Sequence, residues 1–566
     1  MPSPAFPEPR AAIPPTSLSE CDQAVARVHE KRDAWLAVSL DKRIDYLEQC
    51  LKGVREVAAG WVDDLCRVKG LRSDEAMAGE EWLAGPAVTA RNIRLLMENL
   101  RAGGHKPPPA ITTRGNGQKV ARVVPDGIRD KLMFGGVTAE IWIQPGKEAS
   151  QGRIYREPKP AHGKVALVLG AGNVSSIPPM DVLYKLFGED EVVVLKMNPV
   201  NEVLGPHLKR AFKALIDDGF LEIVYGGAEV GAHLASHPQV DTLHVTGSNR
   251  TYDAIVWGGD PKEQADRKAA NSPRNTRPFT AELGAVTPVL VVPGDWNEKE
   301  LKFQAKHVAA SVTQNGSFNC NAGKVLVVAR GWNLRERFID AVHAELKHAT
   351  PRKAYYPGAT QRYQGFLEHY PQAIALGGTG EGIVPWTVIP NVPPDAGQYA
   401  LTNEAFCGVL AEVALDVTTP VEFLQAAVDF ANDKCFGTLS CMLIVDERIQ
   451  RQHATEVDAA IASLRYGGIG INTWPGLIYA LCSTTWGAFP GHTPSDISSG
   501  AGVVHNTFLF DYPEKSVVRS PFVPPLKPAY FSDHKALNKL GQALVEMEAK
   551  PNAGALMSLA MAGMRG

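Results

Sequence analysis

The fold class is decided by residues 164–196, KVALVLGAGNVSSIPPMDVLYKLFGEDEVVVLK. Two short apolar segments, 165–169 and 191–195, enclose a stretch with helical spacing that ends near residue 188. Strands that are apolar on both faces and alternate with helices are typical of βαβ units in a buried parallel sheet, connected by right-handed crossovers. We therefore predict a parallel sheet covered by helices in this part of the chain.

The same alternation continues toward the C-terminus. The next strand-like segments are FLEIVYGG (220–227) and DTLHVTGS (241–248). A second series follows, with TPVLVVPG (287–294), KVLVVAR (324–330) and GTLSCMLIV (437–445), separated by helical stretches such as 297–313. This pattern predicts two α/β domains in tandem.

The regions outside these two series differ in composition. Residues 1–18 are rich in proline, residues 19–100 have helical spacing with few breakers, and residues 103–117 are a Gly/Pro-rich segment that we expect to be an exposed loop. The last 45 or so residues include DHKALNKLGQALVEMEAKP (533–551), whose mixed charge favours a packing helix over a membrane anchor.

Composition and charge exclude several classes of protein. The 566 residues include 58 Lys+Arg and 61 Asp+Glu, so the net charge of -3 offers no cationic surplus for nucleic acid. No stretch approaches the roughly 18 to 20 apolar residues of a membrane span, and the start lacks the apolar run of a signal peptide, so we expect a cytoplasmic protein. The eight cysteines form no CxxC pair and no Cys/His cluster at zinc spacing, so we expect neither a disulfide scaffold nor a metal site.

A glycine turn follows the first strand of the first series. Gly170-Ala171-Gly172-Asn173 is a near miss to a dinucleotide-binding fingerprint at a strand-to-helix turn, where backbone N–H groups can face an anion. The usual fingerprint requires an acid at the end of the next strand, and Lys196 stands there instead. From these residues alone, a purely structural turn is as good an interpretation.

Two further segments carry reactive side chains. Cys320 lies in the small, polar loop NGSFNCNAG (315–323) just before a strand, a placement that favours reactivity if nearby helix ends or amides lower its pKa. Cys441, in contrast, lies inside an apolar strand. Glu282, in TAELG (280–284), is a lone carboxylate, and taken alone it is better interpreted as a solvated strand end.

Taken together, these segments resemble the aldehyde dehydrogenase superfamily over roughly residues 20–520. The resemblance depends on motifs that recur in the family's order: Asn173, Lys196, Thr246-Gly247-Ser248, Glu282-Leu283-Gly284, Cys320 and Glu404-Ala405-Phe406. It implies an aldehyde dehydrogenase-like α/β fold with two tandem Rossmann-type three-layer domains plus an oligomerisation hairpin.

The implied domain boundaries follow the same resemblance. After a Pro-rich tail (1–18), the dinucleotide-binding domain comprises 19–133 and 160–281, and the catalytic domain comprises 282–505. Strands within 134–159 and 506–520 are expected to mediate oligomerisation into a homodimer or homotetramer, the hairpin running from Phe134 to Tyr155. Residues 521–566 form a C-terminal helical extension.

The resemblance also assigns roles to individual residues. Cys320 matches the nucleophile, Glu282 the general base and Asn173 the amide of the oxyanion hole. Cofactor contacts are implied for Gly170, Ala171, Gly172, Lys196, Asn198, Pro199, Gly227, Thr246, Gly247, Ser248, Leu283, Gly284, Glu404 and Phe406. From ungapped spacing and loop position, the expected substrate pocket includes Val174, Pro178, Asp181, Asn319 and Asn321.

The implied reaction is the NAD(P)-dependent oxidation of an aldehyde to a carboxylic acid through a cysteine thioester. Pro199 stands where NAD-specific relatives carry a glutamate, so we expect NADP to be tolerated or preferred. Two alternatives stay open, a CoA-acylating member of the superfamily and a non-catalytic protein on the same scaffold. The presence of Glu282 favours hydrolysis over transfer to coenzyme A.

Overall fold

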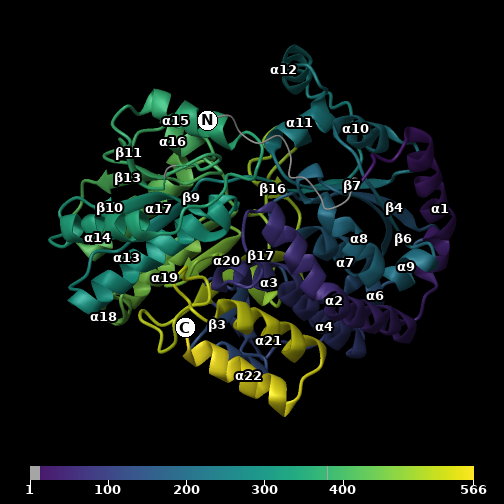
Figure 1. Ribbon diagram of the computed structural model, residues 1–566, viewed down its shortest axis with the longest axis horizontal. Helices are drawn as coiled ribbons and strands as arrows, with labels where there is room; N and C mark the ends of the chain where they lie inside the picture. The colour runs from purple at the N-terminus through teal and green to yellow at the C-terminus, as the bar shows by residue number, and fades with distance from the viewer. Residues whose placement is uncertain (1–12, 379) are drawn as a thin grey trace.

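The chain is built on two β-sheets, each covered by helices (Figure 1). The computed structural model describes residues 13–378 and 380–566, so residues 1–12 of the predicted Pro-rich tail lie outside the described part. One sheet is built mainly from the dinucleotide-binding segments expected from the sequence, with one short strand from residues 500–501, and the other is built mainly from the second series of strands. The predicted α/β fold class is confirmed.

The smaller sheet has six strands in the order β16-β8-β7-β4-β5-β6. Its strands are β4 (Lys164–Leu169), β5 (Glu191–Lys196), β6 (Leu221–Val224), β7 (Thr242–Thr246), β8 (Phe279–Glu282) and β16 (Gly500–Ala501). All pairs are parallel except β16 with β8. The helices of this unit are α1 (Leu18–Leu36), α7 (Ile177–Gly188), α8 (Gly205–Ala211), α9 (Lys213–Asp217), α10 (Ala228–Ser236), α11 (Asn249–Trp257) and α12 (Pro261–Ala269), with the 3-10 helix η3 (Pro199–Leu204). Helices α1 and α7 both pack against β4 and β5, which are buried as their apolar sequences predict.

The larger sheet has eleven strands in the order β1-β2-β3-β17-β15-β14-β9-β10-β13-β12-β11. The seven strands β17 (Pro513–Arg519), β15 (Gly468–Ile471), β14 (Ser440–Ile444), β9 (Thr287–Val291), β10 (Gly323–Ala329), β13 (Val409–Leu415) and β12 (Trp386–Ile389) are mutually parallel, and β11 (Ile374–Gly377) adds an antiparallel edge. Its helices are α13 (Glu298–Thr313), α14 (Arg335–His348), α15 (Ala359–His369), α16 (Tyr399–Thr402), α17 (Pro420–Lys434), α18 (Glu447–Gln452), α19 (Ala454–Ser463) and α20 (Gly476–Leu481), with the 3-10 helix η4 (Gln314–Ser317).

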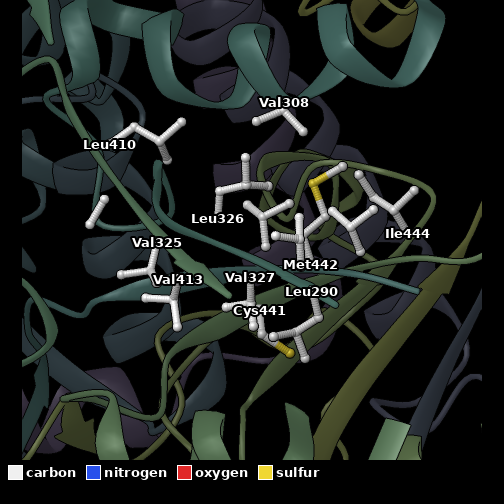
Figure 2. Close-up of a cluster of buried hydrophobic side chains, with 14 of the residues drawn as sticks. Leu290, Val308, Val325, Leu326, Val327, Leu410, Val413, Cys441, Met442 and Ile444 are labelled. Carbon is white, nitrogen blue, oxygen red and sulfur yellow. The ribbon is translucent and has the colours of Figure 1, made fainter. Parts of the chain in front are cut away.

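The core of the larger sheet is aliphatic. Figure 2 shows Val308 of α13 lying over Leu326 and Met442, which come from β10 and β14. Cys441 is buried in the same core, as its position inside an apolar strand indicated. Burial of this kind contributes about 25 cal/mol for each Å² of apolar surface and holds the Cys320 loop, which precedes β10, on a rigid support.

The remaining strands extend the larger sheet within one chain. β1 (Ala110–Thr113), β2 (Lys119–Val124) and β3 (Thr138–Ile143) are antiparallel, and β3 pairs with β17, which in turn pairs with β15. A partner strand for β3 near the C-terminus is thus present, but the pairing needs no second subunit. Oligomerisation through the segments 134–159 and 506–520 stays a prediction.

Two local predictions are wrong. Residues 110–113 of the predicted exposed loop form β1, because an edge strand needs hydrogen bonds on one side only and can follow a proline run. The predicted strand at 153–155 is instead the short helix α6 (Arg153–Arg156), entered through Gly152 in a left-handed conformation with φ 61°. The hairpin is therefore β2–β3 rather than residues 134–155.

Helices from both ends of the chain pack together below the two sheets in Figure 1. They are α2 (Leu40–Val68), the 3-10 helix η1 (Ala76–Ala78), α3 (Gly79–Trp82), the π-helix η2 (Leu83–Ala87), α4 (Val88–Arg101), α5 (Ile128–Met133), α21 (Leu537–Ala549) and α22 (Ala553–Met564). Glu548 of α21 is buried and pairs with Arg91 at 3.1 Å and Arg94 at 2.5 Å. Within the described residues, no helix has the length and apolar character needed to cross a membrane.

Candidate active site

A large cleft, with a volume of about 1660 Å³, is lined by residues of both α/β units. Asn173, Glu282 and Cys320 all line it, as do all the predicted cofactor residues except Ala171 and Pro199. The fold thus brings the segments that carry the predicted catalytic and cofactor residues to one cavity, although Asn173 and Glu404 are 231 residues apart in the sequence.

The backbone before Cys320 is bent sharply. Asn315, Gly316 and Ser317 have φ values of 53°, 66° and 69°, so three successive left-handed residues turn the chain from α13 into the Cys320 loop. All eight cysteines lie in the described part of the chain, and Cys320 is the one that is only partly buried. A bend that exposes a single cysteine to the cleft indicates a nucleophile rather than a core residue.

The Cys320 thiol is not acidified by its surroundings. Burial raises the pKa of Cys320 well above its ordinary value, and the charge of Glu282 and a hydrogen bond to it raise it further. The condition set from the sequence, a lowered pKa, is therefore not met, because burial and the facing carboxylate both raise the pKa of the thiol. The thiol needs a base that takes its proton, and Glu282 faces it.

Glu282 ends β8 and is 1% exposed. Burial, the largest cause, raises its pKa from the ordinary value of 4.5 to about 7, while the hydrogen bond with Cys320 opposes the rise. The interpretation of this residue as a solvated strand end is wrong. A carboxyl whose pKa lies near 7 can both accept and release a proton at neutral pH, as a general base must.

Asn173 is fixed on two sides. Its backbone carbonyl accepts hydrogen bonds from Lys69 Nζ, Asn315 Nδ2 and Tyr355 OH, each at 3.1 Å. Its own Nδ2 donates to the Phe318 carbonyl at 2.9 Å. An amide has two N–H donors, so a second one is available for an oxyanion beside Cys320. Sequence reasoning missed Lys69 and Tyr355, for which no local motif exists, whereas Asn315 stands in the quoted cysteine loop.

The other end of the cleft can accept a phosphorylated ligand. Lys196 ends β5, and burial lowers its pKa to about 8, with the charge of Glu202 opposing this. Ser248 caps α11 by accepting a hydrogen bond from the Thr251 N–H at 3.3 Å, and Gly247 leaves the first turn of that helix open to the cleft. A helix N-terminus beside a lysine is a suitable site for a pyrophosphate.

Glu404 is held close to Gly284 and Lys324. A Cβ atom on Gly284 would lie 2.1 Å from Glu404 Oε2, so only glycine allows this approach. Lys324 Nζ lies 3.7 Å from Glu404 Oε1. Phe406 packs edge-on against Phe318, with ring centroids 5.8 Å apart, and this contact joins the Glu404 loop to the Cys320 loop.

The predicted substrate residues are not brought into the large cleft. Its lining includes none of Val174, Pro178, Asp181, Asn319 and Asn321. The Asp181 side chain is fully buried and contacts Thr246 and His244 of β7 instead. The cleft is lined in addition by cations that sequence reasoning did not select, namely Arg250, Arg274, Arg277 and Arg362.

The fold and this geometry define the class: a two-unit α/β protein with a cysteine, a carboxyl and an amide at one end of a nucleotide-sized cleft. Residues 190–480, just over half of the chain, match the profile of the Aldehyde dehydrogenase family, and the chain belongs to that family. The resemblance stated from the motifs is confirmed.

Individual relatives are more distant. The chain is 25% identical over 281 residues to the aminoacetaldehyde dehydrogenase of Pseudomonas aeruginosa, covering 47% of this chain and 52% of that protein. It is 24% identical over 365 residues to the N-succinylglutamate 5-semialdehyde dehydrogenase of Sphingopyxis alaskensis, covering 56% and 67%. These alignments span about half to two thirds of the relatives' lengths.

Solved structures share the fold. An NAD-dependent aldehyde dehydrogenase from Sinorhizobium meliloti superposes with a TM-score of 0.61 at 18% identity, over 91% of this chain and 89% of that one. An NADP-dependent glyceraldehyde-3-phosphate dehydrogenase from Bacillus halodurans gives 0.60 at 16% identity, over 89% and 92%.

Proposed function

We propose that the protein oxidises an aldehyde to a carboxylic acid, with NAD or NADP as the acceptor, through a thioester on Cys320. The observation that carries the proposal is that Cys320, Glu282 and Asn173 line one cleft together with Lys196 and the Ser248-capped helix, which are suited to phosphate. Family membership supports the same chemistry.

The residues present fit a nicotinamide dinucleotide. The cleft is large enough, the Ser248-capped helix and Lys196 would hold the pyrophosphate and ribose, and Glu404 with Phe406 would hold the nicotinamide end beside Cys320. When bound, the dinucleotide supplies the hydride acceptor. Among the described lining residues the acidic ones are Glu282 and Glu404, and lysine and arginine side chains are more numerous. This excess of positive charge supports tolerance of the 2'-phosphate of NADP.

The first half of the reaction forms the thioester. Glu282 takes the thiol proton, and Cys320 Sγ bonds to the aldehyde carbon. The oxyanion is held by the second N–H of the Asn173 amide and by the Cys320 backbone N–H, each donor lowering the barrier by about 2.7 to 4 kcal/mol. Loss of hydride from the substrate carbon then leaves a thioester on Cys320.

The second half hydrolyses the thioester. Once Glu282 has released the thiol proton, it takes a proton from a water molecule and the water oxygen bonds to the acyl carbon. The C–S bond then breaks to release the acid, and Glu282 returns the proton to the Cys320 sulfur. Because the pKa of Glu282 is about 7, this step requires a pH near or above neutrality for full rate.

An aldehyde panel with both cofactors tests the proposal. Cys320→Ala should abolish aldehyde-dependent cofactor reduction, and the matched control Cys441→Ala, in the apolar core, should not. Glu282→Gln should keep the amplitude of the burst of reduced cofactor but slow its rate, because Glu282 also takes the thiol proton, while turnover falls by about 10² to 10⁴. Unchanged turnover with coenzyme A as acceptor would instead establish the acyl-transferring alternative, and no reduction with any aldehyde would establish the non-catalytic one.

Assembly and location complete the proposal. We infer a cytoplasmic homodimer or homotetramer, supported by the edge strand β1, whose outer backbone groups can accept a strand from another chain. A mass by light scattering that equals one chain would contradict the assembly, and fractionation of cells would test the location.

A further inference from the structure

We propose that Asp181, Thr246, His244 and Thr280 form a buried proton path that leads from Glu282 to a second cavity and restores Glu282 to its carboxylate form. The inference rests on the proposed function, because a path is needed only if Glu282 takes up a proton in each turnover. It gives Asp181 a role other than the substrate contact expected from the sequence.

The path begins with two buried carboxyl groups. Asp181 is 2% exposed and Glu282 is 1% exposed, and each has one oxygen, Oδ1 and Oε2 respectively, with no hydrogen-bond partner among the described residues. Burial raises the pKa of Asp181, and the charge of Asp181 contributes to the raised pKa of Glu282. The charge of Asp181 therefore disfavours the charged form of Glu282, and the two unpartnered oxygens can each accept a proton.

The next groups form a continuous series of short contacts. Thr246 Oγ1 donates to Asp181 Oδ2 at 3.2 Å. His244 Nε2 lies 3.2 Å from Thr246 Oγ1 and 3.4 Å from Asp181 Oδ2, and His244 Nδ1 lies 2.9 Å from Thr280 Oγ1.

Strand geometry explains this series. Residues 244 and 246 of β7 lie on one face because side chains alternate along a strand. The parallel register places Thr246 beside Glu282 and His244 beside Thr280 on β8. The sheet that positions Glu282 therefore also aligns the side chains of the proton path, which leads away from Glu282.

The path ends at a second cavity of about 370 Å³, which Thr280 lines. Lys185, Glu191 and Thr242 line it as well, so it is polar and can hold water. Lys185 is paired with Glu189 and Glu191, and Thr242 Oγ1 donates to Glu191 at 2.6 Å.

Other charged and titratable groups also face the carboxyl pair. Lys185 of α7 and His244 of β7 favour the charged form of Asp181, whereas the Asp181 and Glu282 charges both raise the pKa of Tyr479. Tyr479 OH hydrogen-bonds Ser176 Oγ at 2.8 Å, which keeps it outside the path.

The proton balance is simple. The proton on Glu282 moves to the Asp181 carboxylate and from there, directly or through the Thr246 hydroxyl, to His244 Nε2. His244 Nδ1 releases its own proton to Thr280 Oγ1, and the Thr280 hydroxyl proton passes to water in the second cavity. Rotation of the imidazole restores its tautomer, so Glu282 loses one proton and the water gains one.

The test uses the full chain and p-nitrophenyl acetate, a probe that needs neither an aldehyde nor a cofactor. Attack by Cys320 Sγ releases p-nitrophenolate and leaves an acetyl thioester, whose hydrolysis then limits turnover. The amplitude of the burst reports Cys320, and the steady-state rate reports the return of Glu282 to its carboxylate form through the path. Cys320→Ala should remove the burst.

Two variants have different expected signatures. Asp181→Asn should keep the burst, slow the steady-state rate by roughly 10- to 100-fold, and shift its acid limb to lower pH, because the neutral amide no longer raises the pKa of Glu282. His244→Gln should slow the rate similarly without that shift, because the Asp181 charge is kept. His307→Gln, which replaces a fully buried histidine of α13 outside the path, is the matched control and should change neither phase.

Each of these outcomes either supports or overturns the proposed proton path. Steady-state rates near that of the unaltered protein in both variants would overturn the path. Parallel loss of burst and turnover would overturn it as well, since the two residues would then position Cys320 or the fold. Absence of a burst in the unaltered protein would refute the proposed nucleophile itself, a result distinct from either.

Discussion

Burial of Glu282 should make the native protein less stable at high pH than a variant that lacks this carboxyl. The pKa rises from 4.5 to about 7, and each pH unit of difference corresponds to about 1.36 kcal/mol. The folded state binds the proton more tightly than the unfolded state, so stability falls as the pH rises from about 4.5 and the full penalty of about 3 kcal/mol is reached above pH 7.

Glu282→Gln removes this penalty while keeping the shape of the side chain. The variant should therefore equal the native protein in stability near pH 4.5 and exceed it by at most about 3 kcal/mol at pH 8. For a 566-residue chain with roughly 2.1 cal/mol/K of unfolding entropy per residue, this corresponds to about 2 to 3 °C in Tm.

Thermal unfolding of both proteins between pH 4.5 and 8.5, in matched ionic strength, measures the difference. Hydrolysis of the acetyl thioester by the native protein should in parallel reach its plateau above about pH 7, because the carboxylate is the active form. A gain in Tm that does not depend on pH, or a loss at pH 8, would refute the argument that Glu282 is a desolvated base.

Three further perturbations test the rest of the site and the fold. Gly284→Ala should lower kcat/KM for the dinucleotide by roughly 10²-fold, since a Cβ 2.1 Å from Glu404 Oε2 displaces that carboxylate; an unchanged KM in steady-state kinetics would contradict this. Tyr355→Phe removes one of three donors to the Asn173 carbonyl and should lower the free energy of unfolding by about 0.5 to 1.5 kcal/mol. It should also slow thioester formation in the burst phase and leave the KM for the cofactor unchanged. Glu548→Gln should cost about 3 to 5 kcal/mol in urea unfolding, because it leaves a buried arginine pair short of its counter-charge; a cost below 1 kcal/mol would show that water reaches the pair.

The strands and the site loops could be predicted because their signals are local. An unbroken apolar run identifies a buried parallel strand wherever it occurs, so β4, β5 and β10 begin and end within a few residues of the predicted positions. The motif residues follow such strands, and parallel strands in sheets that face one cleft bring them together. Order and spacing along the chain were sufficient for this part.

The contacts between distant segments could not be predicted in this way. Lys69 comes from the end of α2 and Tyr355 from a loop after α14, yet both bond the Asn173 carbonyl. Their sequence surroundings carry no motif, because their partner is a backbone atom that any residue could supply. Spacing placed Asp181 on the helix after Asn173, where it lies about one turn from the start of α7, but could not tell which face of that helix it occupies.

The position of Glu282 depends on a segment that follows it by more than 200 residues. Gly500 of β16 pairs with Glu282, and a Cβ there would lie 1.9 Å from the Ala281 carbonyl, so a larger residue cannot approach β8 this closely. Ser499 completes the contact, since its carbonyl accepts from the Leu283 N–H at 2.8 Å and its hydroxyl donates to the Gly284 carbonyl at 3.0 Å. The residues on both sides of the base are thereby fixed by the second half of the chain, which also carries Cys320.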